Sequence, residues 1–175
     1  MATLTAALAA LERHLGFPLS RSRSVARQLQ DAGFLSHGGP GQAPAIDRED
    51  YAALFIALAA DNVVREAPAN VRQYFALTPG GVSLEGAPAS IGTARSELLA
   101  LVDTAIEAPD DLREVNIEVV SNFAELAIHW PDAVHRYQPT STIPGKWQVT
   151  THRRATLITG KAFAAAICAT FKGTN

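Results

Sequence analysis

The segment from Leu19 to Ala45 constrains the fold of this chain more than any other part of its 175 residues. It begins with a helix-forming stretch that carries three arginines, SRSRSVARQLQDAGFL, and it ends with a loop of three glycines and two prolines, SHGGPGQAPA. Ser20 is a favoured N-cap residue, and Gly33 can end the last turn in the left-handed conformation. We therefore predict a helix over residues 20–32, followed by a loop that protrudes because it is too rich in glycine and proline to continue the helix.

The predicted helix has two different faces. Val25, Leu29 and Ala32 fall together on a helical wheel, so they are expected to pack against the core. Double-stranded DNA is bound by a cationic, rigid element in the major groove and by flexible backbone near phosphate. The helix and loop therefore indicate a recognition helix followed by a wing; the alternative is that the arginines form a solvated helix face without a ligand. The candidate DNA contacts are Arg21, Arg23, Ser24, Arg27, Gln30 and His37.

The rest of the N-terminal half is also predicted to be helical. Leucines recur at helical spacing in residues 3–15, and Gly16 ends that pattern. Asp47, with Asp50 three residues later, predicts the start of a helix whose sequence, YAALFIALAAD, is apolar on nearly every face. That helix should be central or lie at an interface. A shorter helix is expected at about residues 70–76.

The second half mixes helix and strand. A helix predicted over residues 93–107 is followed by segments 115–119 and 124–130, in which apolar residues alternate with polar ones. This alternation predicts a β-hairpin with one solvated, polar face, on which Glu125 and His129 would lie. The remaining predicted elements are extended pieces at 133–137 and 147–151 and a last helix at 161–171.

These elements predict an α+β fold in two parts. Residues 1–78 would form a mostly helical, winged-helix-like DNA-binding unit. Residues 79–89 have the glycine and proline content of a linker. Residues 90–175 would form a helix, a small antiparallel sheet and a C-terminal helix, used for oligomerisation or for binding a partner.

Charge is segregated along the chain, although the formal net charge is only -2. Residues 1–46 hold four basic and two acidic side chains, residues 47–132 hold five basic and fifteen acidic ones, and residues 133–175 hold six basic side chains and no acid. Both ends are therefore basic and the middle is acidic. Such asymmetry suits a polyanion partner, and it equally suits docking of a basic end on the acidic middle, within a chain or between subunits.

Two short motifs flank the glycine-rich loop. AGFL, at Ala32–Leu35, places a Gly-hydrophobic-hydrophobic step at the end of the arginine-bearing helix, and DREDYAAL, at Asp47–Leu54, starts the next helix with an acid. On these motifs, residues from about 20 to 58 resemble the winged helix-turn-helix DNA-binding domain of MerR-like proteins, in a form that suits a phage or prophage protein. The resemblance implies that Arg23 and Arg27 face the major groove.

One histidine cluster has the spacing of a metal site. His129, Asp132 and His135 could together hold an ion, but Pro131 breaks any helix that would align them. The alternative is that these histidines lie on the polar side of a small sheet. We predict no metal site.

No catalytic group stands out either. Gly160 and Lys161 lack the upstream glycine and the following Ser or Thr of a phosphate-binding loop. Cys168 lies among alanines, so it is expected to be a packed thiol, and as the single cysteine it excludes a disulfide within the chain. We therefore expect a protein that is not an enzyme and needs no cofactor.

Arg153 and Arg154 form a second cationic feature. They could be a further nucleic-acid contact, or they could mark a charged strand end whose arginines pair with the acids between Asp103 and Glu118 of the same or another subunit.

Together these features favour a sequence-specific double-stranded DNA-binding protein, a transcriptional regulator that acts as a homodimer or higher homo-oligomer. The alternatives are a phage-type DNA-packaging adaptor similar to small terminase subunits, and a protein-interaction module or inhibitor that does not bind DNA. The sequence has no secretion signal and no apolar run long enough for a membrane span, so a cytoplasmic location without membrane contact is expected.

Overall fold

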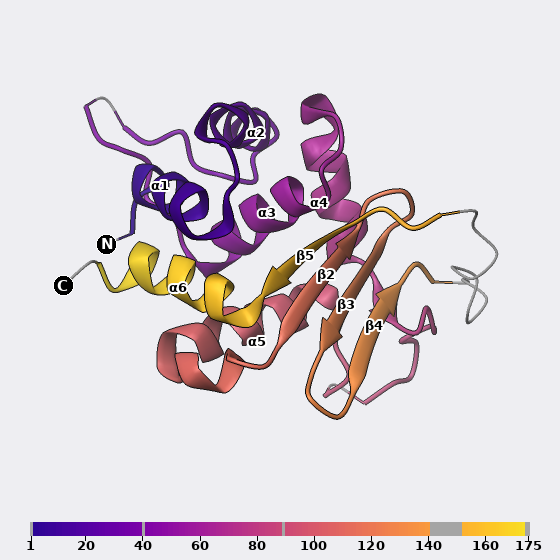
Figure 1. The fold of residues 1–175 in the computed structure, drawn as a ribbon. Helices are drawn as coiled ribbons and strands as arrows, with labels where there is room; N and C mark the ends of the chain where they lie inside the picture. The colour runs from indigo at the N-terminus through magenta and orange to yellow at the C-terminus, as the bar shows by residue number, and fades with distance from the viewer. Residues whose placement is uncertain (1, 40, 89, 141–151, 174–175) are drawn as a thin grey trace.

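The computed structural model of the protein describes residues 2–39, 41–88, 90–140 and 152–173, and it has the α+β fold that the sequence predicts (Figure 1). The extended piece predicted at 147–151 lies outside the described residues. The helices and strands, in chain order, are α1 (Leu4–Leu15), α2 (Leu19–Asp31), α3 (Arg48–Ala59), η1 (Val64–Glu66), α4 (Ala67–Phe75), β1 (Thr78–Pro79), α5 (Ala94–Glu107), η2 (Pro109–Leu112), β2 (Asn116–Val120), β3 (Glu125–His129), β4 (Val134–Gln138), β5 (Ala155–Thr159) and α6 (Gly160–Phe171).

Helix α1 ends at Gly16 as predicted, whereas α2 starts differently from the prediction. The Thr3 hydroxyl accepts a hydrogen bond from the amide of Ala6, and Gly16 ends α1 with a φ of 74°. The prediction that Ser20 caps α2 was wrong, because the helix begins one residue earlier and its N-cap is Pro18. A proline lacks an amide hydrogen and has a fixed φ. It therefore suits the position just before a helix, whose amide makes no hydrogen bond within the helix.

The inner face of α2 is narrower than predicted. Val25 and Leu29 are buried as expected, but Ala32 is exposed. The prediction that Ala32 packs against the core was wrong because the last helical residue is Asp31, so Ala32 no longer follows the helical wheel. Gly33 then turns the chain with a φ of 76°, the left-handed conformation predicted for it.

Helix α3 occupies the centre of the molecule, as its uniformly apolar sequence predicts. Asp47 and Asp50 form a reciprocal capping box at its start. Every residue from 51 to 60 is buried, and the rings of Tyr51 and Phe55 lie edge-on to Phe163 of α6, at centroid distances of 6.4 Å and 4.9 Å. In the described part of the chain, neither α3 nor any other helix combines the length and apolarity that crossing a bilayer requires.

The sheet has five strands in the order β1-β4-β3-β2-β5, and every neighbouring pair is antiparallel. The predicted hairpin is confirmed as β2 and β3, with Ile117 opposite Ile128. Strand β5 runs directly into α6 at Gly160, where a Cβ atom on this glycine would lie 2.2 Å from the carbonyl oxygen of Leu112. Only glycine therefore fits at this close approach of two backbones.

One hydrophobic core runs through both halves of the chain. Its residues extend from Leu4 of α1 to Ile167 of α6, and these two helices lie side by side (Figure 1). Strand β1, at the end of the predicted first unit, pairs with β4, so that Thr78 is opposite Gln138. The predicted boundary at residues 79–89 consequently does not separate two hydrophobic cores.

Candidate nucleic-acid interface

Helices α1 and α2 are joined by a three-residue turn, residues 16–18, which gives the helix-turn-helix order of elements. The turn is fixed by Gly16 and by the Glu12 carboxylate, which accepts a hydrogen bond of 3.2 Å from the amide of Leu19 at the start of α2. This carboxylate thereby pairs with a backbone amide at the start of α2, as the side chain of an N-cap residue would. The second helix is thereby held with its apolar side against α3 and its other side in solvent.

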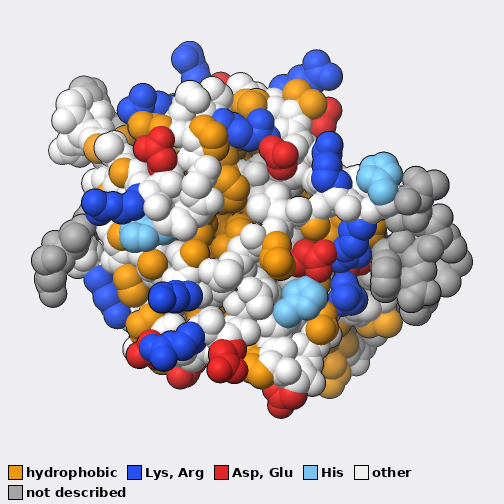
Figure 2. Space-filling model, viewed as in Figure 1, with side chains coloured by type: hydrophobic (Ala, Val, Ile, Leu, Met, Phe, Trp, Pro, Cys, Tyr) orange, Lys and Arg blue, Asp and Glu red, His pale blue; other side chains and the backbone are white. Residues whose placement is uncertain are grey.

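The solvent side of α2 is a continuous stripe. Ser20, Arg23, Ser24, Arg27 and Asp31 are all exposed, and their spacing of three or four residues places them on one helical face. We refer to Arg23, Ser24 and Arg27 as the α2 basic face. Figure 2 shows Lys and Arg side chains spread over the upper part of the molecule, above α2 and α4, with acidic side chains between them.

The two arginines of the α2 basic face have no polar partner in the part of the chain that the structure describes. Arg23 and Arg27 make no hydrogen bond or ion pair with any described residue, whereas the Ser24 hydroxyl donates to the carbonyl oxygen of Ser20 at 3.1 Å. Most other arginines in the described residues are paired with an acid or stacked on a ring. Two cations one helical turn apart are therefore free to contact a ligand.

Arg21 lies beside this face, and its guanidinium has a partner within the protein. Its Nη2 atom donates to the carbonyl oxygen of Asn62 at 2.7 Å and is 3.1 Å from the Asp61 carboxylate. Asp61 has a positive φ of 48°, so the chain turns sharply after α3 at the point where Arg21 contacts it. Arg21 thus ties α2 to the end of α3.

Gln30 and His37 lie at the junction of α2 with the glycine-rich loop. The Gln30 amide donates to the carbonyl oxygen of Ser36 at 2.8 Å, which fixes the first residues of the loop against the helix. His37 is exposed in that loop. Gly38, with a φ of 75°, is so close to Gln42 that a Cβ atom would lie 2.8 Å from its carbonyl oxygen. The tight turn therefore requires glycine.

The glycine-rich loop returns to the N-terminus of the chain and pairs with it. An antiparallel bridge joins Thr3 to Ala45, and the amide of Leu4 donates to the carbonyl oxygen of Pro44 at 2.8 Å. Among the described loop residues, 36–39 and 41–45, this bridge is the one β-pairing observed. The base of the loop is anchored next to α1, and the described residues of the loop lead away from the helices (Figure 1).

Further cations lie next to α2. Arg65 belongs to η1, which packs against α2, and it is exposed without a partner among the described residues. Arg72 of α4 stacks over the ring of Phe34, with its guanidinium carbon 5.1 Å from the ring centroid. Asp31 and Asp61 are the acids closest in sequence to the ends of α2 and α3. The surface around the α2 basic face therefore carries both basic and acidic side chains, with a modest excess of basic ones.

The two histidines that have the sequence spacing of a metal site do not face one another. His135 pairs with Ile128 in the sheet and His129 pairs with Val134, so the two histidines lie on opposite faces. The His129 Nε2 atom is 2.9 Å from the Glu118 carboxylate, and the His135 Nδ1 atom is 3.5 Å from Glu97. No three histidine, cysteine or acidic side chains of the described residues have the arrangement of a metal site.

The residues considered above for phosphate binding or catalysis, Gly160, Lys161 and Cys168, differ in their surroundings. Gly160 is buried where α6 meets the chain before β2, and Lys161 is exposed. The Cys168 thiol donates to the carbonyl oxygen of Ala105 in α5, at 3.3 Å. These contacts agree with the prediction of a packed thiol and give the glycine a packing role rather than a phosphate-binding one.

A buried ionic network, which the sequence did not reveal, crosses the polar face of the sheet. Glu125 was predicted to lie on a solvated face, but this was wrong because its side chain is completely buried. Its carboxylate accepts hydrogen bonds from Arg136 at 2.8 Å, Gln138 at 2.7 Å and Arg153 at 2.6 Å. Arg153 also donates to Glu118 at 2.8 Å. Of the two alternatives for Arg153, pairing with an acid of the same chain is the one observed.

The electrostatics of this network centre on Glu118. Burial alone would raise the pKa of this carboxyl, but hydrogen bonds from Arg153 and His129 hold the pKa below its ordinary value. Arg154, next to Arg153, instead contacts the turn between β2 and β3, where its Nε donates to the Ser121 hydroxyl at 2.8 Å.

Searches of protein-family models, curated protein sequences and solved structures found no match to this chain.

Proposed function

We propose that the protein binds double-stranded DNA through the α2 basic face and that it acts as an oligomeric transcriptional regulator without catalytic activity. The observation that carries the proposal is a pair of arginines, Arg23 and Arg27, that have no partner among the described residues and lie on the exposed side of α2, the second helix in a helix-turn-helix order of elements. An arginine whose charge is not used within the protein is available for phosphate or for a guanine edge.

The spacing of the two arginines suits this role. Four residues of α-helix rise about 6 Å, close to the distance of about 7 Å between every second base on a DNA strand. Ser24 is exposed next to them, and its hydroxyl can donate to a phosphate in exchange for its hydrogen bond to the Ser20 carbonyl oxygen. The loop that follows α2 is joined to the end of that helix by the Gln30–Ser36 hydrogen bond and carries the exposed His37, so it has the place in the chain that the wing of a winged helix has.

Affinity should depend on oligomerisation. Two free arginines, with Arg65 nearby, give each subunit few phosphate contacts, so a monomer would bind weakly. A dimer places two α2 helices on successive half-sites. Light scattering tests this: a dimer supports a regulator, a ring of many subunits supports a packaging adaptor, and a strict monomer contradicts both.

The test is fluorescence anisotropy on a mixed-sequence duplex of about 30 base pairs at two salt concentrations. The double variant R23A/R27A should bind at least about tenfold more weakly than the parent. The matched control is K161A/K172A, which removes two exposed positive charges, one in the first turn of α6 and one directly after the helix, that have no ion-pair partner among the described residues; it should keep the parent's affinity. Equal loss in both variants, or no salt-dependent binding by the parent, would contradict the proposal.

A further inference from the structure

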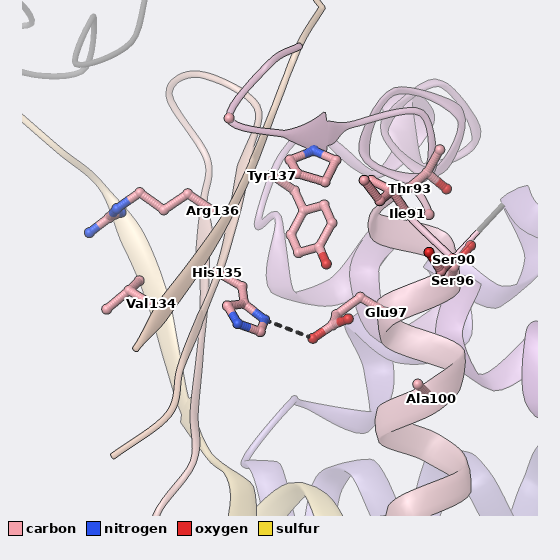
Figure 3. A pocket seen from close by; sticks show the side chains of 13 residues that line it. Ser90, Ile91, Thr93, Ser96, Glu97, Ala100, Val134, His135, Arg136 and Tyr137 are labelled. Atoms are coloured by element: carbon pink, nitrogen blue, oxygen red, sulfur yellow. Dashed lines mark hydrogen bonds and ion pairs between the residues drawn. The ribbon is translucent and has the colours of Figure 1, made fainter. Parts of the chain in front are cut away.

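A cleft of about 710 Å³ lies between the start of α5 and strand β4 (Figure 3). One wall is the first turns of α5, the other is residues 134–137 of β4, and the segment 90–93 closes one end. A volume of this size lies within the range of small-molecule sites in proteins. The cleft uses no residue of the α2 basic face.

Three polar side chains from the two walls converge inside the cleft. Figure 3 shows the His135 ring and the Tyr137 hydroxyl pointing toward the carboxylate of Glu97. Burial, the charge of Glu97 and a hydrogen bond to it together raise the pKa of Tyr137. The Tyr137 hydroxyl therefore stays protonated and donates to this carboxylate.

Glu97 keeps hydrogen-bonding capacity for a ligand. An ionised carboxylate accepts about four hydrogen bonds, and the protein supplies it with the Tyr137 hydroxyl and the longer His135 contact of 3.5 Å. Its side chain is 21% exposed, so it is partly withdrawn from solvent but open to the cleft. A carboxylate in this setting attracts a cation more strongly than one on the open surface does.

The rest of the lining supplies hydroxyl groups and apolar surface. Ser90, Thr93 and Ser96 line the cleft, and their hydroxyls have no hydrogen-bond partner among the described residues. Ile91 also lines the cleft, and its side chain is 46% exposed. Val134 contributes to the wall from β4, but its side chain lies with that of Arg136 on the other face of the sheet (Figure 3). A molecule in the cleft would cover the apolar surface of Ile91.

The cleft has no free arginine to offset the charge of Glu97. Arg136 belongs to the lining, but Figure 3 shows its side chain pointing away from the cleft, and its Nη1 atom is 2.8 Å from Glu125 on the other face of the sheet. We propose that the cleft binds a small organic cation: an ammonium or guanidinium group on the Glu97 carboxylate and an apolar body against Ile91, with the hydroxyls of the lining available to polar substituents.

The proposal is tested with three probes of nearly equal shape and different charge, in isothermal titration calorimetry on the full chain. Tyramine carries an ammonium group, 4-ethylphenol is its neutral analogue, and 3-(4-hydroxyphenyl)propionate is an anion. Tyramine should bind saturably, and the neutral and anionic probes should bind at least about tenfold more weakly, because they leave Glu97 without a charged partner. Equal binding of the three, or no saturable binding of tyramine up to about 10 mM, overturns the proposal.

Two variants locate the site. Glu97→Gln keeps the size of the side chain and removes its charge, so tyramine affinity should fall about tenfold or more. Glu107→Gln makes the same change at an exposed position near the end of α5, outside the cleft, and should bind tyramine as the parent does. An unchanged affinity in Glu97→Gln overturns the assignment. The probe comparison on the parent chain decides the question independently if this variant does not fold.

Discussion

Replacing Glu125 with glutamine should destabilise the fold more than any other single change of charge on the sheet. The carboxylate is fully buried, and one of its oxygens, Oε1, accepts from both Arg136 and Arg153 while the other accepts from Gln138. A glutamine at this position fills the same space and keeps one oxygen. The change therefore removes the negative charge and one acceptor without opening a cavity.

The expected cost follows from how far the two arginines are buried. Breaking a fully buried ion pair by removing one partner costs about 3–5 kcal/mol. The side chains of Arg136 and Arg153 are 33% and 22% exposed, so water screens part of the loss, and Arg153 keeps its hydrogen bond with Glu118. We expect the free energy of unfolding to fall by about 2–3 kcal/mol.

Urea unfolding followed by circular dichroism measures this loss, with the slope of the transition as a check that the denatured state is unchanged. Glu107→Gln is the control, because Glu107 is exposed and its side chain makes no hydrogen bond or ion pair with a described residue, and it should change stability by less than about 0.5 kcal/mol. A loss below about 0.5 kcal/mol in Glu125→Gln would refute the reasoning, since it would mean that neither arginine depends on this carboxylate.

Three further predictions concern other parts of the fold. Gly160→Ala should lower the unfolding free energy by about 3 kcal/mol or more in a urea titration, because the new Cβ atom would lie 2.2 Å from the Leu112 carbonyl oxygen; a near-neutral effect would mean that this approach relaxes easily. Asp47→Ala removes one half of the α3 capping box and should reduce the thermal midpoint, at a cost of about 1 kcal/mol, whereas the conservative Asp47→Asn should retain most of the cap. The pKa of Glu118 is lowered in the folded protein, so its contribution to stability is complete above its ordinary pKa of 4.5 and is lost as the pH falls through the lower folded pKa; stability in Glu118→Gln should decline less across that acid range, and identical pH profiles would contradict the assignment.

Local sequence patterns predicted the elements whose formation depends on near neighbours. The leucine spacing of α1, the Asp47 and Asp50 box of α3, and the alternation that gives the β2–β3 hairpin are all set within a few residues of chain. The start of α2 was misplaced because its capping group is Glu12, seven residues earlier, and not the local Ser20.

The parts that sequence reasoning missed depend on contacts between distant segments. Alternation placed Glu125 on the polar face of its strand, but nothing local shows that Arg153, 28 residues later, covers it. The cleft likewise joins Glu97 to His135, 38 residues away, across a helix and a strand. One weak signal was present in the sequence. His135 and Tyr137 are two residues apart in a strand, so they lie on the same face, where they would contact a polar residue of a helix packed over that face.

The measurement that tests the central claim most directly is the NMR mapping of a DNA complex. An ¹⁵N-labelled sample would be titrated with a short mixed-sequence duplex, and the change in each backbone amide resonance followed to saturation. The account predicts that the largest changes fall on the exposed side of α2, at Arg23, Ser24 and Arg27, and in the loop around His37, while the amides of the sheet change little. Changes confined to the sheet or to α6, with α2 unaffected, would contradict it.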